Sequence, residues 1–323
     1  MDIMVTRARK IYTDGKHNAF TGICRFAEKT YVCFRSAVSH TALPSKIKVI
    51  ASSDHENWSV ALETGIVDDN IDNRDPKIAA FKSKLFVYYP EYTGSSLEGE
   101  PKKTRFMVVS SEDGNEFGDP VQTQGLPDRL WLFWVTPRDD KLYGAGYGGG
   151  KVAVAESSDG LTWSVLTELP VEKGNETSLD FDPDGTMWTL TREDSFGYVP
   201  TVCVLEPPYT EVKRKFRIPI RLQGPMIKRV PGGSIIVCRQ RDRTPAGLRN
   251  TRTEILWLPD EDETPRRAHV LPSGGDTSYA DWLDMEEGKA VVSYYSSHEH
   301  QMLVPTFHSK PADIFLADIR YEP

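Results

Sequence analysis

Three arginines stand where a cation is costly, and they are the first candidates for chemistry. Each ends an otherwise apolar run that reads as a β-strand: Arg35 ends VCFR, Arg192 ends TLTR and Arg239 ends IVCR. A guanidinium buried without a partner costs free energy, so each of them needs an anion nearby. One interpretation is a clamp for a carboxylate ligand, because the guanidinium fork matches carboxylate oxygens in pairs. The other is three structural arginines, each bound to a neighbouring Asp or Glu or to loop carbonyls.

A short repeated pattern indicates which elements hold these residues. Residues 52–58, 111–117 and 157–163 each read Ser-x-Asp-x-x-x-aromatic, and each segment follows a strand-like run. Asp and Ser side chains can bond the amides of a turn, while the aromatic residue covers the base of the hairpin. We therefore predict a β-hairpin turn at each of the three segments.

A longer repeat predicts the fold. A unit of apolar strand, polar turn and apolar strand occurs six times, with starts 46 to 56 residues apart. The starts are Asn18, Asn73, Arg129, Asn175, Gln223 and Gly275. This spacing corresponds to one four-stranded blade per unit, which is the period of β-propellers. The fold class is therefore all-β, a six-bladed β-propeller formed by residues 1–323 as one domain. The sixth blade lacks a strand, and the N-terminal run MVTRARKIY can supply it and close the ring.

Propeller geometry then gathers the candidate residues at one place. In each blade the innermost strand starts on the face where the second strand ends, so both points lie above the central channel. The strand starts contribute Arg74, Asp75, Glu176, Asp276 and Tyr279. The strand ends and the loops after them contribute Arg35, His40, Tyr147, Arg192, Arg239, Arg241, Tyr295 and His298.

The three Ser-x-Asp segments resemble the Asp-box repeats of the sialidase (neuraminidase) superfamily. The six-blade count matches the architecture of that family, and as a fold the resemblance covers nearly the whole chain. Asp-boxes also occur in propellers that are not sialidases, so they specify architecture well and activity poorly.

The resemblance implies roles for four residues. Sialidases have a glutamate and a tyrosine where this chain has Glu176, in Asn-Glu-Thr-Ser-Leu, and Tyr279, in Asp-Thr-Ser-Tyr. By resemblance, Tyr279 is the nucleophile, Glu176 is its base, and Arg192 and Arg239 grip the substrate carboxylate. A phenol with a pKa of about 10 is a poor nucleophile until a base takes its proton and nearby arginines lower its pKa. A tyrosine also avoids opposing a carboxylate nucleophile to a carboxylate substrate.

The sequence departs from the family pattern at two places. The family's Arg-Ile-Pro at the first inner strand is replaced by Phe20-Thr21-Gly22-Ile23, so one clamp arginine is missing, and Arg35 on the adjacent strand end is a possible substitute. The family's acid/base aspartate has no counterpart in SAVSHTALPSK, where His40 stands instead. A histidine can do acid/base work near neutral pH, although a lone loop histidine is more often merely solvated. Asp75 is the other acid candidate, and its alternative is a turn residue paired with Arg74.

The remaining candidates lie around the same face. Arg74 and Arg241 are counted as substrate-binding residues. Tyr295 and His298, in and after the last blade's second strand, could bind sugar hydroxyls or belong to a polar loop that seals the ring. No cofactor and no metal are expected, since the seven histidines show no zinc spacing.

Composition excludes several classes of partner. A net charge of −8 and a pI of about 5.5 disfavour a nucleic-acid binder, which usually carries a basic excess. No apolar run approaches the length of a membrane helix. The start of the chain lacks the apolar stretch of a secretory leader, so the chain as given is expected to be cytoplasmic. The four cysteines lie in apolar strand-like runs without CxxC spacing and are expected to be free thiols.

Three functions remain open at this stage. The first is an exo-acting glycosidase that removes a terminal acidic sugar through Tyr279, with the arginines and the Tyr–Glu pair around one pocket. The second is a lyase or unusual glycosidase of uronate-containing glycans, with His40 or Tyr279 transferring the proton and no carboxylic acid opposite His40. The third is a non-catalytic glycan- or protein-binding propeller, in which local acids neutralise the arginines.

Overall fold

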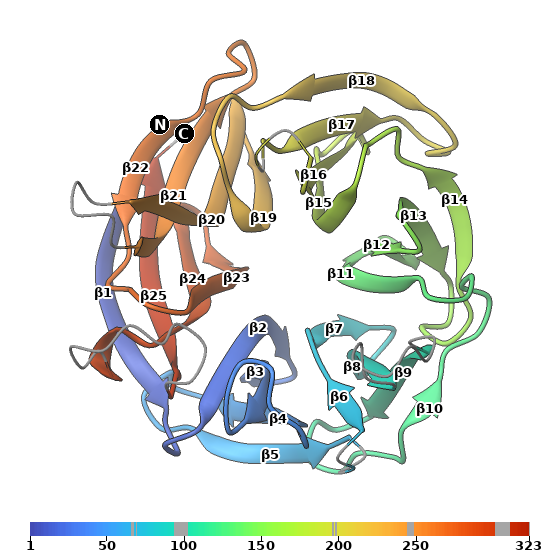
Figure 1. Ribbon diagram of the computed structural model, residues 1–323, viewed down its shortest axis with the longest axis vertical. Coiled ribbons are helices and arrows are strands. Elements are labelled where there is room, and N and C mark those ends of the chain that lie inside the picture. Colours follow the sequence, from blue (N-terminus) through green and yellow to red (C-terminus); the bar gives the residue numbers. More distant parts are fainter. Residues whose placement is uncertain are drawn as a thin grey trace.

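Six antiparallel β-sheets stand like blades around a central axis (Figure 1). The computed structural model describes residues 1–65, 68, 70–93, 103–195, 197, 199–243, 249–300 and 311–322. Each sheet has four strand positions from the axis outward, as the repeat predicts. The six-bladed β-propeller expected from the sequence is therefore confirmed.

The strands of the first three blades follow the chain in order from the axis outward. Blade one contains β2 (His17–Phe26), β3 (Lys29–Ala37), β4 (Lys46–Ser52) and β5 (Ser59–Thr64). Blade two contains β6 (Ile71–Asn73) and β7 (Lys77–Phe81), which both pair with β8 (Lys84–Thr93), followed by β9 (Lys103–Ser111) and β10 (Val121–Gln122). Blade three contains β11 (Trp131–Arg138), β12 (Lys141–Gly148), β13 (Lys151–Ser157) and β14 (Ser164–Glu168).

Blades four and five repeat this order, and blade six is completed from the other end of the chain. Blade four contains β15 (Gly174–Phe181), β16 (Met187–Glu193), β17 (Thr201–Leu205) and β18 (Val212–Arg217). Blade five contains β19 (Gln223–Val230), β20 (Gly233–Arg243), β21 (Arg249–Pro259) and β22 (Arg266–Val270). Blade six contains β23 (Thr277–Glu286), β24 (Lys289–Ser296), β25 (Asp313–Glu322) and, outermost, β1 (Asp2–Tyr12).

The N-terminal strand closes the ring, as expected. β1 pairs antiparallel with β25 from Asp2 opposite Glu322 to Tyr12 opposite Ile314. The two ends of the chain therefore lie side by side at the edge of the molecule (Figure 1). Pairing the first strand with the last also covers a sheet edge that would otherwise be open to another chain.

The burial of the middle strands explains why the repeat can be recognised in the sequence. Blades pack face to face, so their middle strands are covered on both sides: every residue of β3 after Lys29 and of β24 after Lys289 is buried. Such strands read as continuous apolar runs. No residue of the outermost strands β18 and β22 is buried, and their sequences are correspondingly charged.

The Ser-x-Asp turns have the predicted chemistry. They join the third and fourth strands of blades one, two and three, and in each turn one Asp oxygen accepts two backbone N–H groups. Asp54 accepts at 2.9 and 2.8 Å, Asp113 at 2.8 and 2.9 Å, and Asp159 at 2.8 and 2.7 Å. The last aromatic residue of the pattern, Trp163, is buried beneath its turn.

Two further expectations concern the described part of the chain. No helix there is long and apolar enough to cross a membrane, and the helical element is the 3-10 turn η1 (His298–His300). All four cysteines are free, and all but the half-buried Cys24 are buried.

Candidate active site

The backbone is irregular near the starts of the innermost strands, where the candidate residues lie. In blades one, five and six the register of the innermost strand shifts near its start, between Ala19 and Gly22, Gln223 and Met226, and Ser278 and Asp281. Residues at the starts of five blades have a positive φ: Phe20 (65°), Asp75 (36°), Arg129 (68°), Gly224 (54°) and Tyr279 (48°). A bulge re-aims a side chain, and a positive φ in a residue other than glycine often marks a functional site.

Tyr279 and Glu176 meet above the axis, although 103 residues separate them in the chain. The phenol O–H of Tyr279 donates to Oε1 of Glu176, which also accepts Nη1 of Arg192 at 2.8 Å. Oε2 of Glu176 accepts the backbone N–H of Gly224 at 2.8 Å. Glu176 is 5% exposed and Tyr279 is 8% exposed, so both groups are largely shielded from water.

The surroundings of this pair set where its proton rests. Burial alone would raise the pKa of Glu176, but the charges of Arg192 and Arg239, together with the hydrogen bonds from Tyr279 and the Gly224 amide, outweigh burial and lower it. Burial and the Glu176 charge raise the pKa of Tyr279, and the two arginines only partly oppose them. The expectation that arginines leave Tyr279 with a lowered pKa is therefore wrong for the net effect. At rest the phenol is protonated and the carboxylate is ionised.

Arg239 lies against Tyr279, and its guanidinium is also bound by a carboxylate of the protein. Its guanidinium carbon is 5.0 Å from the centre of the Tyr279 ring, and Nη2 donates to the Tyr279 hydroxyl at 3.4 Å. Nη1 donates to Oδ1 of Asp276 at 3.2 Å. Arg192 is held in a similar way, by Glu176 and by Asp194, each at 2.8 Å. Both arginines therefore border the Tyr–Glu pair, and both are engaged by acids of the protein.

Arg35 differs from these two. Its side chain is 0% exposed. Nε donates to Asp72 at 2.8 Å, Nη1 to the carbonyl of Ser39 at 3.1 Å and Nη2 to the carbonyl of Ala42 at 2.8 Å. These contacts are those of the structural interpretation rather than of a substrate clamp. Arg35 fastens the loop that carries His40.

Arg74 and Asp75 reach the site from the break between β6 and β7. Arg74 pairs with Asp72 at 3.0 Å, lies 4.0 Å from Asp75 and stands 5.1 Å over the ring of Phe20. Asp75 is 7% exposed. Burial, with a contribution from Glu176 and against the effect of Arg74, raises the pKa of Asp75 to about 6. A carboxyl group with this pKa can both donate and accept a proton near neutral pH.

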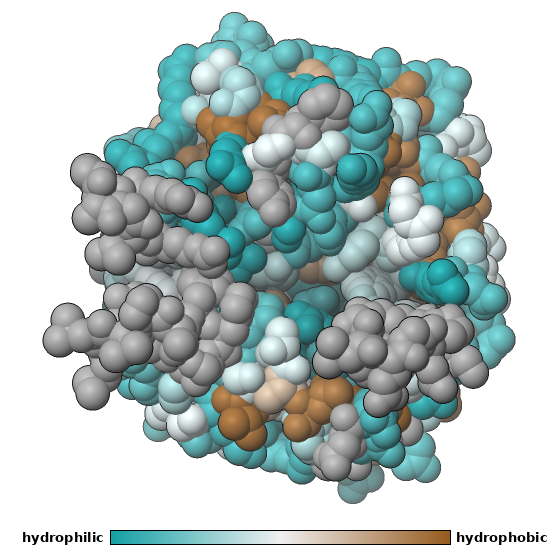
Figure 2. All heavy atoms as spheres, in the orientation of Figure 1, coloured by the Kyte–Doolittle hydropathy of each residue, from teal (hydrophilic) through white to brown (hydrophobic). Residues whose placement is uncertain are grey.

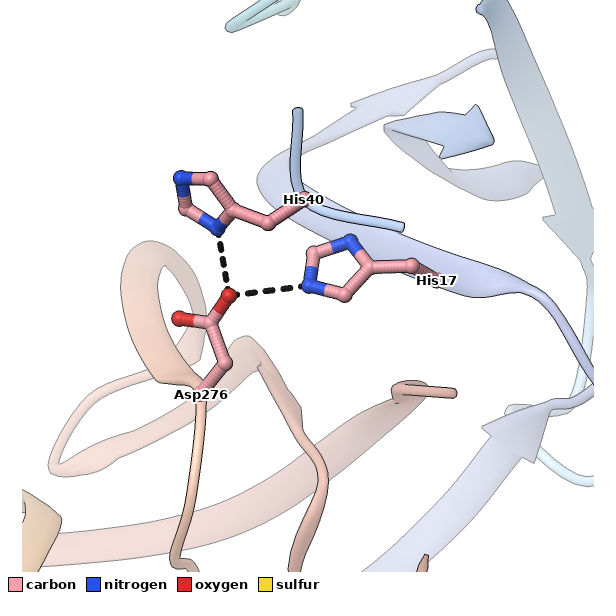
Figure 3. A group of neighbouring side chains, drawn as sticks. All are labelled: His17, His40 and Asp276. Carbon is pink, nitrogen blue, oxygen red and sulfur yellow. Dashed lines mark hydrogen bonds and ion pairs between the residues drawn. The ribbon is translucent and has the colours of Figure 1, made fainter. Parts of the chain in front are cut away.

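A second cluster is centred on Asp276 (Figure 3), and Arg239 connects it to Tyr279. Oδ2 of Asp276 is bound by Nε2 of His17 at 2.8 Å and by Nδ1 of His40. Oδ1 accepts the hydroxyl of Tyr295 at 2.8 Å and Nη1 of Arg239. The Asp276 side chain is 0% exposed. Burial lowers the pKa of His40 to about 4, although Asp276 opposes this effect, so His40 is neutral at pH 7.

The same three residues are the group that could hold a metal ion among the described residues. Two ligands about 2.1 Å from a tetrahedral zinc ion lie roughly 3.4 Å apart. The 2.8 Å separation between His17 and Asp276 is that of a hydrogen bond, and His40 lies nearer still. The cation Arg239 also occupies the other oxygen of Asp276. The arrangement fits a hydrogen-bond network better than a metal centre.

Phe20, in the segment where the sequence departs from the Arg-Ile-Pro pattern, packs against three residues of the site. Its ring packs edge-on against Tyr279 at 4.9 Å, His40 at 5.3 Å and Tyr295 at 5.6 Å between ring centres. Tyr295 is thus part of the Asp276 cluster, as a buried residue. The Phe20 ring is 2% exposed and has the Arg74 guanidinium 5.1 Å from its centre, so this side of the site keeps a cation although the ring itself is apolar.

The outer candidates lie at the margin. Arg241 lines a small cavity of about 40 Å³ together with Arg239 and Gln223. His298 belongs to η1, where its ring packs 4.8 Å from Phe315 and Nδ1 contacts the hydroxyl of Ser296 at 3.0 Å. Figure 2 shows this face of the molecule, with hydrophilic residues around the recess at its centre.

His17 and the role of Asp276 were missed by sequence reasoning. His17 precedes the first blade start by one residue, and Asp276 precedes Tyr279 by three. Taking one more residue before each strand start would have included His17. Nothing in the sequence pairs these two residues, because blade six meets blade one only when the ring closes.

Comparisons with known proteins agree on the fold. No protein-family model and no curated protein matches this sequence. A protein of unknown function from Dyadobacter fermentans superposes with a TM-score of 0.78 at 14% identity, over 99% of each chain. Trypanosoma rangeli sialidase in complex with the inhibitor DANA superposes with a TM-score of 0.66 at 11% identity, over 94% of this chain and 55% of the sialidase. An exo-β-1,3-galactanase from Clostridium thermocellum gives 0.58 at 13% identity, over 82% of this chain and 65% of the galactanase. The structures similar to this propeller thus include glycoside hydrolases.

Proposed function

We propose that this protein is a glycoside hydrolase that releases a terminal acidic sugar by double displacement through Tyr279. The observation that carries the proposal is the hydrogen bond from Tyr279 to a buried, ionised Glu176, bordered by Arg192 and Arg239. The likeness of the fold to a sialidase supports it. Trypanosoma rangeli sialidase is also known in complex with 2,3-difluorosialic acid as a covalent intermediate.

In the first step the Tyr279 oxygen attacks the anomeric carbon while its proton passes to Glu176. Because burial keeps the phenol protonated, proton transfer accompanies attack rather than preceding it. The bond to the leaving group breaks, and the leaving oxygen takes a proton from Asp75. In the second step the Asp75 carboxylate takes a proton from water, the water oxygen replaces Tyr279 on the sugar, and Glu176 returns the proton to the phenol.

Asp75 suits the acid/base role better than His40. With a pKa of about 6, Asp75 is partly protonated near neutral pH and can give and regain a proton within one turnover. With a pKa of about 4, His40 lacks the proton that a leaving group requires. In this mechanism activity needs ionised Glu176 and protonated Asp75. The rate is expected to fall as pH rises above about 6 and again below the lowered pKa of Glu176.

The acidic substrate is the finer part of the proposal. A tyrosine nucleophile is an advantage where a substrate carboxylate lies next to the attacked carbon, since a carboxylate nucleophile would be repelled. Arg192 binds Glu176 and Arg239 contacts the Tyr279 hydroxyl, so both guanidinium groups are near enough to the proposed nucleophile to bind such a carboxylate. Asp194 pairs with Arg192 and Asp276 pairs with Arg239, and these carboxylates offset part of the positive charge of the two arginines. A substrate carboxylate would therefore share the guanidinium groups with Asp194 and Asp276.

A lyase acting on uronate-containing glycans is the second candidate. It is favoured by the neutral His40, whose ring Asp276 orients, because a neutral imidazole can abstract a proton. The carboxyl group of Asp75 in the same site counts against it, since the lyase hypothesis expects no carboxylic acid opposite His40. A non-catalytic glycan-binding propeller is the third, and the pairing of the arginines with local acids favours it.

The test uses fluorogenic glycosides of sialic acid, glucuronic acid and galactose, beside ultraviolet detection of an unsaturated uronate from polysaccharides. Tyr279→Phe is compared with Tyr294→Phe, which removes the hydroxyl of another buried tyrosine, bonded to the Pro272 carbonyl at 3.0 Å. Fluorophore release from an acidic glycoside that is lost only in Tyr279→Phe supports the proposal. A mass increase on the Tyr279 peptide after incubation with 2,3-difluorosialic acid would identify the nucleophile directly. An unsaturated product without fluorophore release favours the lyase. No product in any of the assays favours the non-catalytic glycan-binding propeller.

A further inference from the structure

We propose that Asp276 is the positioning residue of this site, because its buried carboxylate orients the imidazole of His40 with one oxygen and the guanidinium of Arg239 with the other. The inference builds on the proposed function, in which Arg239 borders the nucleophile, and it also concerns His40, the residue on which the lyase alternative depends. It adds a residue that touches neither Tyr279 nor, in the proposed chemistry, the substrate.

The geometry is that of a saturated acceptor. Four donors converge on the Asp276 carboxylate: His17 and His40 on Oδ2, and Tyr295 and Arg239 on Oδ1. A carboxylate accepts about four hydrogen bonds, so this one is fully used. The Asp276 side chain has no exposed surface, so bulk water does not compete for these bonds.

The first consequence concerns the proton of His40. Since Oδ2 of Asp276 only accepts, a neutral His40 must carry its proton on Nδ1, which leaves the lone pair on Nε2. In Figure 3 the Nε2 atom of His40 points away from Asp276. Asp276 therefore fixes both the ring orientation and the tautomer of His40, and it fixes the proton of His17 on Nε2.

The second consequence concerns Arg239. Its Nη1 is tied to Asp276 at 3.2 Å, which keeps Nη2 within 3.4 Å of the Tyr279 hydroxyl and the guanidinium over the Tyr279 ring. The Asp276 carboxylate thus links His40, from blade one, to Arg239, from blade five. Arg239 in turn lies against the proposed nucleophile, Tyr279, from blade six.

The Asp276→Asn variant tests this arrangement with nearly unchanged shape. Its amide oxygen can serve Arg239 and Tyr295, but its NH₂ group then faces the two histidines. His40 must accept with Nδ1, so its proton is expected to move to Nε2. Asp313→Asn is the matched control, because Asp313 is also buried and binds a histidine, His300, at 2.9 Å, outside the cluster.

Three measurements are made on the full chain: histidine tautomers by long-range ¹H–¹⁵N NMR, kinetics on an acidic glycoside, and the melting temperature. The wild type is expected to show the Nδ1–H form of His40 and Asp276→Asn the Nε2–H form. The variant is also expected to lose about 10- to 100-fold in kcat with a smaller change in KM, because the neutral amide holds Arg239 less firmly in place beside Tyr279. Asp313→Asn is expected to keep both the His40 tautomer and kcat.

Several outcomes would overturn the inference. They are an Nε2–H tautomer of His40 in the wild type, a folded Asp276→Asn variant with unchanged tautomer and kcat, and an equal loss of kcat in Asp313→Asn. One equivalent of zinc or iron in the wild type that is lost in Asp276→Asn would also overturn it, because the same atoms would then be ligands. The NMR measurement needs no substrate, so it decides the inference even if no glycoside is hydrolysed.

Discussion

Replacing Asp75 by asparagine is expected to stabilise the protein at neutral pH while removing its activity. Burial raises the pKa of Asp75 from its usual 3.8 to about 6. The folded state therefore holds this proton more tightly than the unfolded chain, and stability falls as pH rises through the window from 3.8 to 6. Below that window the carboxyl is neutral in both states and costs nothing. Above it, the charge is disfavoured in the fold.

The magnitude follows from the size of the shift. About two pH units at 1.36 kcal/mol each give a destabilisation of about 3 kcal/mol at pH 7, which Asp75→Asn should relieve. Asparagine tolerates the positive φ at this position, and Arg74 keeps its partner Asp72 at 3.0 Å. With an unfolding entropy of about 2.1 cal/mol/K per residue over 323 residues, the gain corresponds to a melting temperature ~4 °C higher at pH 7.

The assay is denaturant unfolding of wild type and variant at pH 4 and pH 7, with kinetics on the same samples. The variant should be about equal to the wild type at pH 4 and more stable at pH 7, and its kcat should fall roughly 10²- to 10⁴-fold. Asp113→Asn serves as a control of opposite sign, since turn amides lower the pKa of Asp113 to about 2 and the substitution should destabilise the protein at pH 7. A stability difference for Asp75→Asn that does not change between the two pH values would refute the reasoning.

Two further substitutions separate structural from functional roles. Arg35→Met is expected to cost about 3 kcal/mol of unfolding free energy, because it leaves the carbonyls of Ser39 and Ala42 and part of the Asp72 charge without their buried donor. Unchanged urea unfolding would show that this guanidinium is not structural. Gly224→Ala would place a Cβ 3.0 Å from the Tyr279 ring at a φ of +54°, so kcat should fall at least tenfold. Full activity in that variant would contradict the tight placement of Tyr279 against blade five.

The sequence by itself determined the architecture. Burial on both blade faces makes middle strands such as β3 continuous apolar runs, and local turn chemistry at Asp54, Asp113 and Asp159 marks the hairpins. Both signals lie within a few neighbouring residues, so they can be read without any knowledge of distant contacts. The starts and ends of the strands also sufficed to bring Glu176, Tyr279, Arg192 and Arg239 to one face.

Only the tertiary structure decided what each of these residues does there. Arg35 and Arg239 lie near the ends of similar strands. The guanidinium of Arg35 donates to Asp72 and to two loop carbonyls, whereas that of Arg239 lies against Tyr279. The pKa values of Asp75 and Tyr279 depend on burial and on charges from other blades, which no local pattern records. The network of Asp276 with His17 and His40 exists because ring closure sets blade six beside blade one. The sequence predicted the strand that closes the ring, but the pairing of single side chains more than two hundred positions apart depends on how the closed ring sets its blades.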